Sequence, residues 1–150
     1  MKKLYFKDLN LDHQKILYKW YNLKSVLKNS LKGKKFPYIE HRKWFLIQLK
    51  SKNIIKIIYI DDIPIGVIRL EKKNSFLLLS YMIAPKYRRK GYAYKAIKRM
   101  VFNSKYNKLK KIVAIVKKDN IPSIKIFRKL KFVKKNNVKN KKFLKFEHST

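Results

Sequence analysis

The chain has 150 residues, of which 41 are lysine or arginine and 8 are aspartate or glutamate, giving a formal net charge of +33. It contains no cysteine, which excludes disulfides, thiolate metal ligands and a cysteine nucleophile. Hydrophobic residues make up 46% and aromatic residues 14%, so we expect one folded domain over residues 1–150 rather than a disordered chain.

The charge has two explanations, of which coding composition is favoured over a nucleic-acid or ribosome partner. Lysines far outnumber the six arginines and lie along the whole chain, together with many isoleucines and asparagines. An AT-rich coding sequence would produce this composition without a functional cause. Attraction to RNA, to ribosomes or to anionic lipid is the other explanation, and in either case the field would attract a polyanionic small ligand.

No apolar run approaches the roughly 20 residues that span a bilayer. The first ten residues, MKKLYFKDLN, lack the apolar core of a signal peptide, so we expect a cytoplasmic protein.

The first third of the chain reads as a strand and two helices. A short strand is expected over 2–6, a polar connection over 24–37, and helices over 11–22 and 38–50. The apolar side of the first helix comprises Ile16, Leu17, Trp20 and Tyr21, and that of the second Trp44, Phe45, Leu46 and Leu49.

Three strands follow, over 53–60, 65–71 and 75–83. The short turns at 61–64 and 72–74 predict an antiparallel meander. The third strand is apolar on both faces, as expected for a central strand of a covered sheet.

The last third alternates helices and strands. A helix after Pro85 carries the apolar stripe of Ala93, Ala96, Ile97, Met100 and Val101, and a strand over 110–116 follows. Asp119-Asn120 and Pro122 start a helix whose apolar side is Ile121, Ile124, Phe127 and Leu130. Two short strands, 131–135 and 141–147, end the chain. We expect each strand–helix–strand unit to be parallel, giving an α/β fold with a mixed sheet and helices on both faces.

The segment RRKGYA, at 88–93, joins the central strand to a helix. Arg88, Arg89 and Lys90 supply charge, Gly91 leaves the backbone bare, and a helix N-terminus presents unpaired N–H groups. This order is typical of a phosphate-binding site, although a basic turn before a surface helix is the alternative. The segment matches neither the Walker loop nor the dinucleotide fingerprint.

The wider arrangement resembles motif A of the GNAT superfamily of N-acetyltransferases. The matching residues are Ile83, Pro85, Arg88, Gly91 and Ala93. A second block, NIPSIKIFRKLKF at 120–132, resembles the superfamily's motif B, and the resemblance covers nearly the whole chain. It implies a single-domain GNAT fold and an acyltransferase that uses acetyl-CoA as cosubstrate and needs no metal.

The resemblance also implies where acetyl-CoA is held. The strand end at Met82 and Ile83 would bond the pantetheine arm. The pyrophosphate would lie on the loop and helix start at Arg88, Arg89, Lys90, Gly91, Tyr92 and Ala93. The end nearest the thioester would contact Asn120, Ser123 and Phe127. An amine would attack the thioester directly, with no covalent enzyme intermediate.

Two positions depart from the family pattern. Many relatives have a tyrosine, thought to protonate the departing thiolate, where this chain has Phe127; Tyr81, Tyr92 and Tyr94 are alternatives. Relatives place glycine where this chain has Lys131, so either a left-handed lysine costs about 1 kcal/mol there or the helix ends differently.

The catalytic base is sought among few acidic residues. Glu40 and His41 are the best pair, because they open a helix that borders the acceptor site in this superfamily. The simpler explanation is that both are ordinary residues of a helix N-terminus, which the macrodipole and solvent favour.

For the acceptor, the pattern most resembles the branch that acetylates 4-amino sugars on nucleotide carriers. It overlaps with the acetyltransferases of ribosomal-protein N-termini, and a basic cleft suits the anionic sugar nucleotide better. The further alternative is an inactive CoA- or RNA-binding module. A monomer and a homodimer are both compatible with the sequence.

Overall fold

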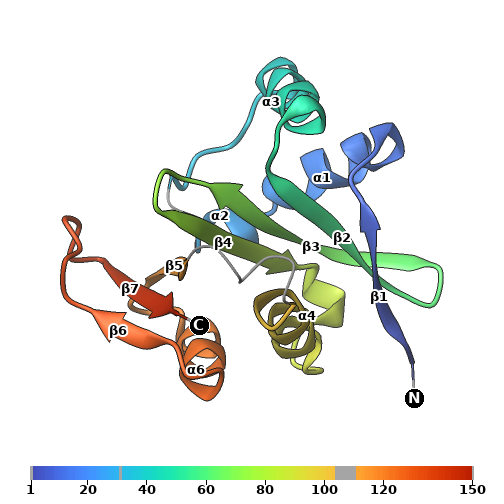
Figure 1. Ribbon diagram of the computed structural model, residues 1–150. Helices are drawn as coiled ribbons and strands as arrows, with labels where there is room; N and C mark the ends of the chain where they lie inside the picture. The colour runs from blue at the N-terminus through green and yellow to red at the C-terminus, as the bar shows by residue number, and fades with distance from the viewer. Residues whose placement is uncertain (1, 31, 104–110, 150) are drawn as a thin grey trace.

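The computed structural model describes residues 2–30, 32–103 and 111–149. In these ranges seven strands form one sheet between two layers of helices (Figure 1), in the order β1-β2-β3-β4-β5-β7-β6. The strands are β1 (Leu4–Asp8), β2 (Ile54–Ile60), β3 (Ile63–Lys72), β4 (Phe76–Ile83), β5 (Lys111–Lys117), β6 (Val133–Lys135) and β7 (Phe143–His148). The helices are α1 (Gln14–Tyr21), α2 (Lys24–Leu27), α3 (Tyr38–Lys50), α4 (Tyr92–Val101) and α6 (Ile121–Lys129), with 3-10 turns η1 (Leu11–His13) and η2 (Pro85–Tyr87).

The predicted meander is confirmed, because β2, β3 and β4 pair antiparallel in chain order, and β4 and β5 are parallel as expected. β6 is also parallel to β5, as expected, but the two strands do not pair with each other. β7 lies between them and is antiparallel to both, so β6 runs in the direction of β5 without touching it. Short strands separated by one turn pair most readily with each other, and the hairpin β6–β7 enters the sheet as a unit.

The helices follow the predicted ranges with local differences. α3 has the predicted bounds, and the strand predicted over 110–116 begins at Lys111, Lys110 lying outside the described residues. The connection predicted over 24–37 contains the short helix α2. Leu46 and Ile121, predicted to be buried, are exposed. No helix in the described ranges is long and apolar enough to cross a membrane.

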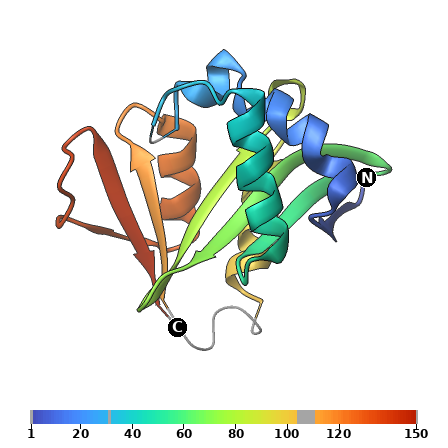
Figure 2. The ribbon, with the colours of Figure 1, turned by 90° about the horizontal axis from the view of Figure 1, so that it is seen from above.

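Each face of the sheet has its own apolar core, and the helices divide between the two faces (Figures 1 and 2). α4 and α6 cover one face with Ile97, Met100 and Phe127 among the buried side chains. α1 and α3 cover the other with Leu17, Trp20 and Phe45.

Of the two alternatives at the end of α6, the structure has the left-handed lysine. Lys131 has φ +66°, and its N–H donates to the carbonyl of Arg128, while the Phe132 N–H donates to the carbonyl of Phe127, both at 3.0 Å. These two hydrogen bonds form a Schellman motif, which satisfies carbonyls at the helix end and positions Phe132 in the core.

Candidate functional site

The central strands β4 and β5 part from each other halfway along their length. Their pairing runs from Phe76 with Lys111 to Leu79 with Ala114 and then stops, although β4 continues to Ile83 and β5 to Lys117. Beyond that point β4 stays paired with β3, and β5 with β7, so the two strands diverge in a V (Figure 2). The inner edge of β4 over residues 80–83 therefore has no strand partner, and its backbone groups, apart from the Ile83 carbonyl, are available to a ligand.

The loop after β4 is shaped for an anion. Arg89 and Gly91 have φ of +61° and +81°, and α4 begins directly after Gly91, with no side chain capping its first N–H groups. A Cβ added to Gly91 would meet no heavy atom within 4 Å, so the backbone faces open space. Successive N–H groups in such a turn, the helix N-terminus, and the exposed cations Arg89 and Lys90 form a cradle that could hold a phosphate.

Arg88 has a different position from its two neighbours. It is partly buried, and its Nε donates to the carbonyl of Ile83 at 2.8 Å, at the end of β4. Burial lowers the pKa of its guanidinium. Arg88 therefore fastens the loop to the open end of β4.

The first turn of α6 reaches across the V. The Asn120 side chain caps the helix by accepting from the Ser123 N–H at 3.4 Å, which confirms the predicted helix start. The buried Ser123 hydroxyl is hydrogen-bonded to the hydroxyl of Tyr81 on β4. Burial raises the pKa of Tyr81, so its phenol stays protonated. Tyr81 was one of three alternative proton donors in the sequence, but no local pattern indicated its bond to Ser123.

The remaining residues expected around the donor lie in or beside the core. Met82 is buried toward α1 and α3, and Ile83 is buried on the opposite face, as alternation along a strand requires. Tyr92 and Ala93, in the first turn of α4, are half-buried. The Phe127 ring is buried among Phe132, Phe146 and Tyr81, whose ring centroid lies 6.3 Å away.

Glu40 and His41 do not form a pair, because they point to different sides of α3. Glu40 is exposed, whereas His41 is fully buried, and neither of its ring nitrogens has a hydrogen-bond partner. Burial lowers the pKa of His41. Five aromatic rings surround its imidazole: Tyr18, Tyr21, Phe36, Trp44 and Phe45.

Sequence reasoning missed a polar and aromatic group on the α1/α3 face, which we call the Arg69 cluster: Arg69, Ser80, Trp44 and Tyr21. The Arg69 Nε donates to the Ser80 hydroxyl at 3.1 Å, and its guanidinium lies 5.4 Å from the Trp44 ring. The rings of Trp44 and Tyr21 are 5.6 Å apart. Ser80 is the first residue of β4 beyond the last pair with β5, so the cluster lies where the V opens. The arginine that follows the apolar run of β3 was the available signal.

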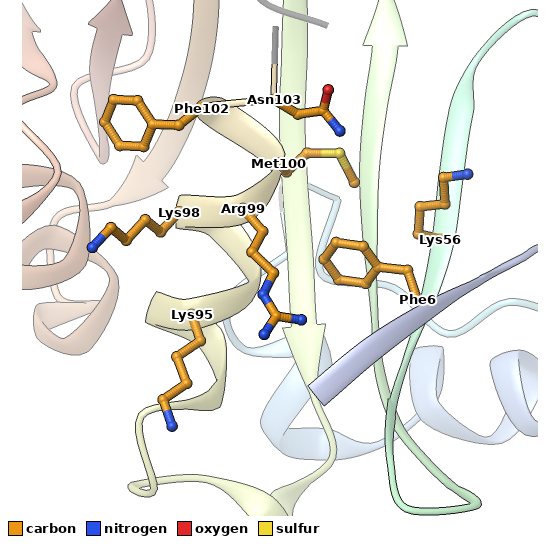
Figure 3. Close-up of a pocket in the computed structure, with 8 residues that line it drawn as sticks. All are labelled: Phe6, Lys56, Lys95, Lys98, Arg99, Met100, Phe102 and Asn103. Carbon is orange, nitrogen blue, oxygen red and sulfur yellow. The ribbon is translucent and has the colours of Figure 1, made fainter. Parts of the chain in front are cut away.

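A hollow of about 700 Å³ lies elsewhere, over the C-terminal part of α4 and beside β1 and β2 (Figure 3). Its lining contains four cations but none of the residues predicted to bind the donor: Phe6, Lys56, Lys95, Lys98, Arg99, Met100, Phe102 and Asn103. Lys98 and Phe102 point away from Phe6. Among the described residues, no group of histidines and carboxylates is arranged to hold a metal ion.

Comparison with solved structures identifies the fold. The chain superposes with a TM-score of 0.80 on a spermidine N-acetyltransferase from Vibrio cholerae in complex with CoA and spermine, at 14% identity over 96% of this chain and 92% of that one. It matches a ribosomal L7/L12 alpha-N-protein acetyltransferase in complex with CoA at 0.81, with 13% identity over 97% and 93% of the chains. An N-acetyltransferase from Staphylococcus aureus Mu50 matches at 0.81, with 16% identity over 98% of each chain.

No curated protein sequence matches the chain significantly. The family model described as the acetyltransferase (GNAT) domain matches residues 3–133, which include the V, the loop after β4 and the whole of α6. The resemblance of the two sequence motifs and the observed sheet topology agree with this match, and the chain therefore belongs to the GNAT family of acetyltransferases.

Proposed function

We propose that this protein transfers the acetyl group of acetyl-CoA to the primary amine of an anionic small molecule, namely a 4-amino sugar on a nucleotide carrier. The observation that supports this choice of acceptor is the Arg69 cluster, in which one cation and two aromatic rings lie where β4 and β5 part. Arginine binds phosphate oxygens in a bidentate manner, and aromatic rings offer flat apolar surfaces. A sugar ring joined to phosphates matches both features.

As a GNAT acetyltransferase, the protein uses acetyl-CoA as its cosubstrate. The free edge of β4 at residues 80–83 is suited to the amide groups of the pantetheine arm. The cradle at residues 89–93 is suited to the pyrophosphate. The hydrogen bond from Arg88 to Ile83 holds this cradle in place relative to the free edge of β4. CoA is present in the structures of the Vibrio cholerae enzyme and the ribosomal-protein enzyme, which share this fold.

In the reaction, the acceptor nitrogen forms a bond to the thioester carbon and the carbon–sulfur bond breaks. Unpaired N–H groups at the end of β4 would stabilise the negative oxygen of the intermediate. The amine loses one proton to solvent, and the departing thiolate takes one. Because Phe127 carries no proton, we assign that transfer to Tyr81, whose ring contacts Phe127 and whose hydroxyl lies at the V.

Positively charged acceptors fit this chain less well. The structural relatives include a spermidine acetyltransferase and a ribosomal-protein acetyltransferase, so one fold serves different acceptors. A polyamine needs free carboxylates, and this chain has only eight acidic residues. Three of them, Asp8, Glu71 and Glu147, are already in ion pairs with lysines.

Replacing Arg69 tests the acceptor site. In Arg69→Gln the KM for a UDP-linked 4-amino sugar should rise at least about tenfold, because a charge-assisted contact to phosphate is lost. The KM for acetyl-CoA should stay within about twofold, since the donor cradle is intact. The matched control is Arg128→Gln, which removes an exposed arginine from α6. An unchanged sugar KM in Arg69→Gln would refute the role of the cluster.

A further inference from the structure

The outward face of α3 carries large apolar side chains that no described part of the chain covers. Ile39 is 68% exposed, Ile47 is 65% exposed and Leu46 is 40% exposed. Their spacing places them on one side of the helix, opposite the buried His41 and Phe45. α3 lies in front of the sheet in Figure 2, and no described segment of the chain lies outside it. Since the inward face already completes the core, packing within the chain does not explain the outward one.

The same face is positively charged. Lys43 and Lys50 lie between the aliphatic side chains on the helical repeat, and Arg42 lies beside them. Glu40 is the only acidic residue of the helix and lies at the edge of this face. None of the ion pairs among the described residues involves these three cations.

The charge narrows the choice of occupant. A second copy of the chain would also bring a net charge of +33, so two such faces repel each other. An acidic protein would pair with the cations but would need a shaped apolar pocket for Ile39 and Ile47. An anionic lipid surface supplies both chemistries without a fitted shape, because acyl chains receive the aliphatic groups and phosphates receive the cations.

We propose that the outward face of α3 docks this enzyme on an anionic membrane surface. Ile39, Leu46 and Ile47 enter the boundary between headgroups and acyl chains. Arg42, Lys43 and Lys50 extend along the helix surface to the lipid phosphates, as long basic side chains do at interfaces. The rest of the basic surface adds long-range attraction. This proposal does not depend on the identity of the acetyl acceptor.

Vesicle co-sedimentation tests the proposal. The full chain is mixed with vesicles of equal parts phosphatidylglycerol and phosphatidylcholine, and with vesicles of phosphatidylcholine alone, at physiological salt. We expect binding to the anionic vesicles and little to the neutral ones. Ile39→Ser/Ile47→Ser should weaken binding at least about tenfold, because two inserted side chains are lost at unchanged net charge.

The matched control is Ile63→Ser/Val133→Ser, which removes two exposed apolar side chains from β3 and β6, 48% and 58% exposed. It should bind vesicles like the parent, and thermal melts show whether both variants are folded. If both double variants bound the anionic vesicles equally well, the proposal would be overturned, because charge alone would then hold the protein on the vesicles. Failure of the parent to bind anionic vesicles would also overturn the proposal. That holds even if immobilised polyglutamate, which stands for an acidic protein, retained the chain through α3. A stable homodimer that Ile39→Ser/Ile47→Ser converts to monomer in light scattering would also overturn it.

Discussion

The hydroxyl of Tyr81 on β4 and the hydroxyl of Ser123 in the first turn of α6 are hydrogen-bonded across the V between the two central strands. One phenol thus links the strand that is suited to the pantetheine arm to the helix that Asn120 caps. The aromatic neighbour of Tyr81 is Phe127, at the position where many relatives have a tyrosine. The proton donor can therefore come from the strand instead of the helix.

Two variants distinguish the contribution of this hydrogen bond to stability from the role of the Tyr81 phenol in proton transfer. Tyr81→Phe and Ser123→Ala both break it, and each should lower the free energy of unfolding by about 1 kcal/mol. Only Tyr81→Phe removes the phenol, so only it should lower kcat, by about a hundredfold. Denaturant melts and steady-state kinetics give both quantities. Equal losses of kcat in the two variants would mean that the bond matters and the phenolic proton does not.

Adding a Cβ at Gly91 has two separate expected effects, a loss of stability from backbone strain and a loss of acetyl-CoA affinity from contact with the ligand. In Gly91→Ala the strain at φ +81° should cost about 1–2 kcal/mol of stability, since no protein atom crowds the new methyl group. Acetyl-CoA affinity should fall about tenfold or more, because the methyl group occupies space proposed for the pyrophosphate.

Gly33→Ala is the matched control, because Gly33 also has a positive φ, +65°, and an added Cβ would meet only an ordinary contact at 3.8 Å. It should lose similar stability and keep its affinity in isothermal titration calorimetry. Parallel loss of affinity in the two variants would assign the effect to stability rather than to the cradle.

Lys131 is a residue at which the chain can be stabilised. Its φ of +66° is unfavourable for a side chain, while the Schellman bonds hold it there. Lys131→Gly should raise the free energy of unfolding by up to about 1 kcal/mol, the gain being reduced by the greater freedom of glycine in the unfolded chain. For a chain of this size the melting temperature should rise by about 2–4 °C. A lower melting temperature would contradict this account.

Burial lowers the pKa of His13, His41 and His148 from 6.5. Each is therefore harder to protonate in the folded chain than in the unfolded one. The stability that these neutral histidines contribute is present above pH 6.5, which is their pKa in the unfolded chain. It is lost as the pH falls from that value through the lower pKa of the folded chain.

His41→Leu should remove part of the loss of folding stability at acidic pH, because it deletes two buried nitrogens that have no hydrogen-bond partner. Thermal melts in mildly acidic buffer should show a larger gain for this variant than melts in mildly alkaline buffer. The variant should also keep its kcat, since His41 is enclosed by aromatic rings. Loss of kcat in a folded His41→Leu would restore this histidine as the catalytic base.

The sequence predicted features whose cause is local. The period of apolar residues defined α3 and α4, the tight turns defined the meander, and Asn120 with Pro122 defined the start of α6. It did not predict the insertion of β7, because which strand lies beside β5 depends on how the final hairpin enters the sheet.

In the site, the loop with Gly91 was evident because charge, glycine and helix start are adjacent in the chain. Arg69 and Trp44 were not, because they come from a strand and a helix that meet only in the fold. The separation of Glu40 and His41 follows from the helical repeat, which turns neighbouring residues by about 100°. His41 was assigned to the acceptor site because it opens a helix that borders that site in this superfamily, but α3 buries it beside Phe45.

The most direct test is to follow free thiol release from acetyl-CoA by the purified protein with each of three acceptors. These are a UDP-linked 4-amino sugar, spermidine, and the N-terminal peptide of a ribosomal protein. We predict rapid release with the sugar nucleotide and at most a background rate with the two others. Release with spermidine or the peptide, and none with the sugar, would contradict the acceptor assigned to the Arg69 cluster while leaving the acetyl-CoA site intact.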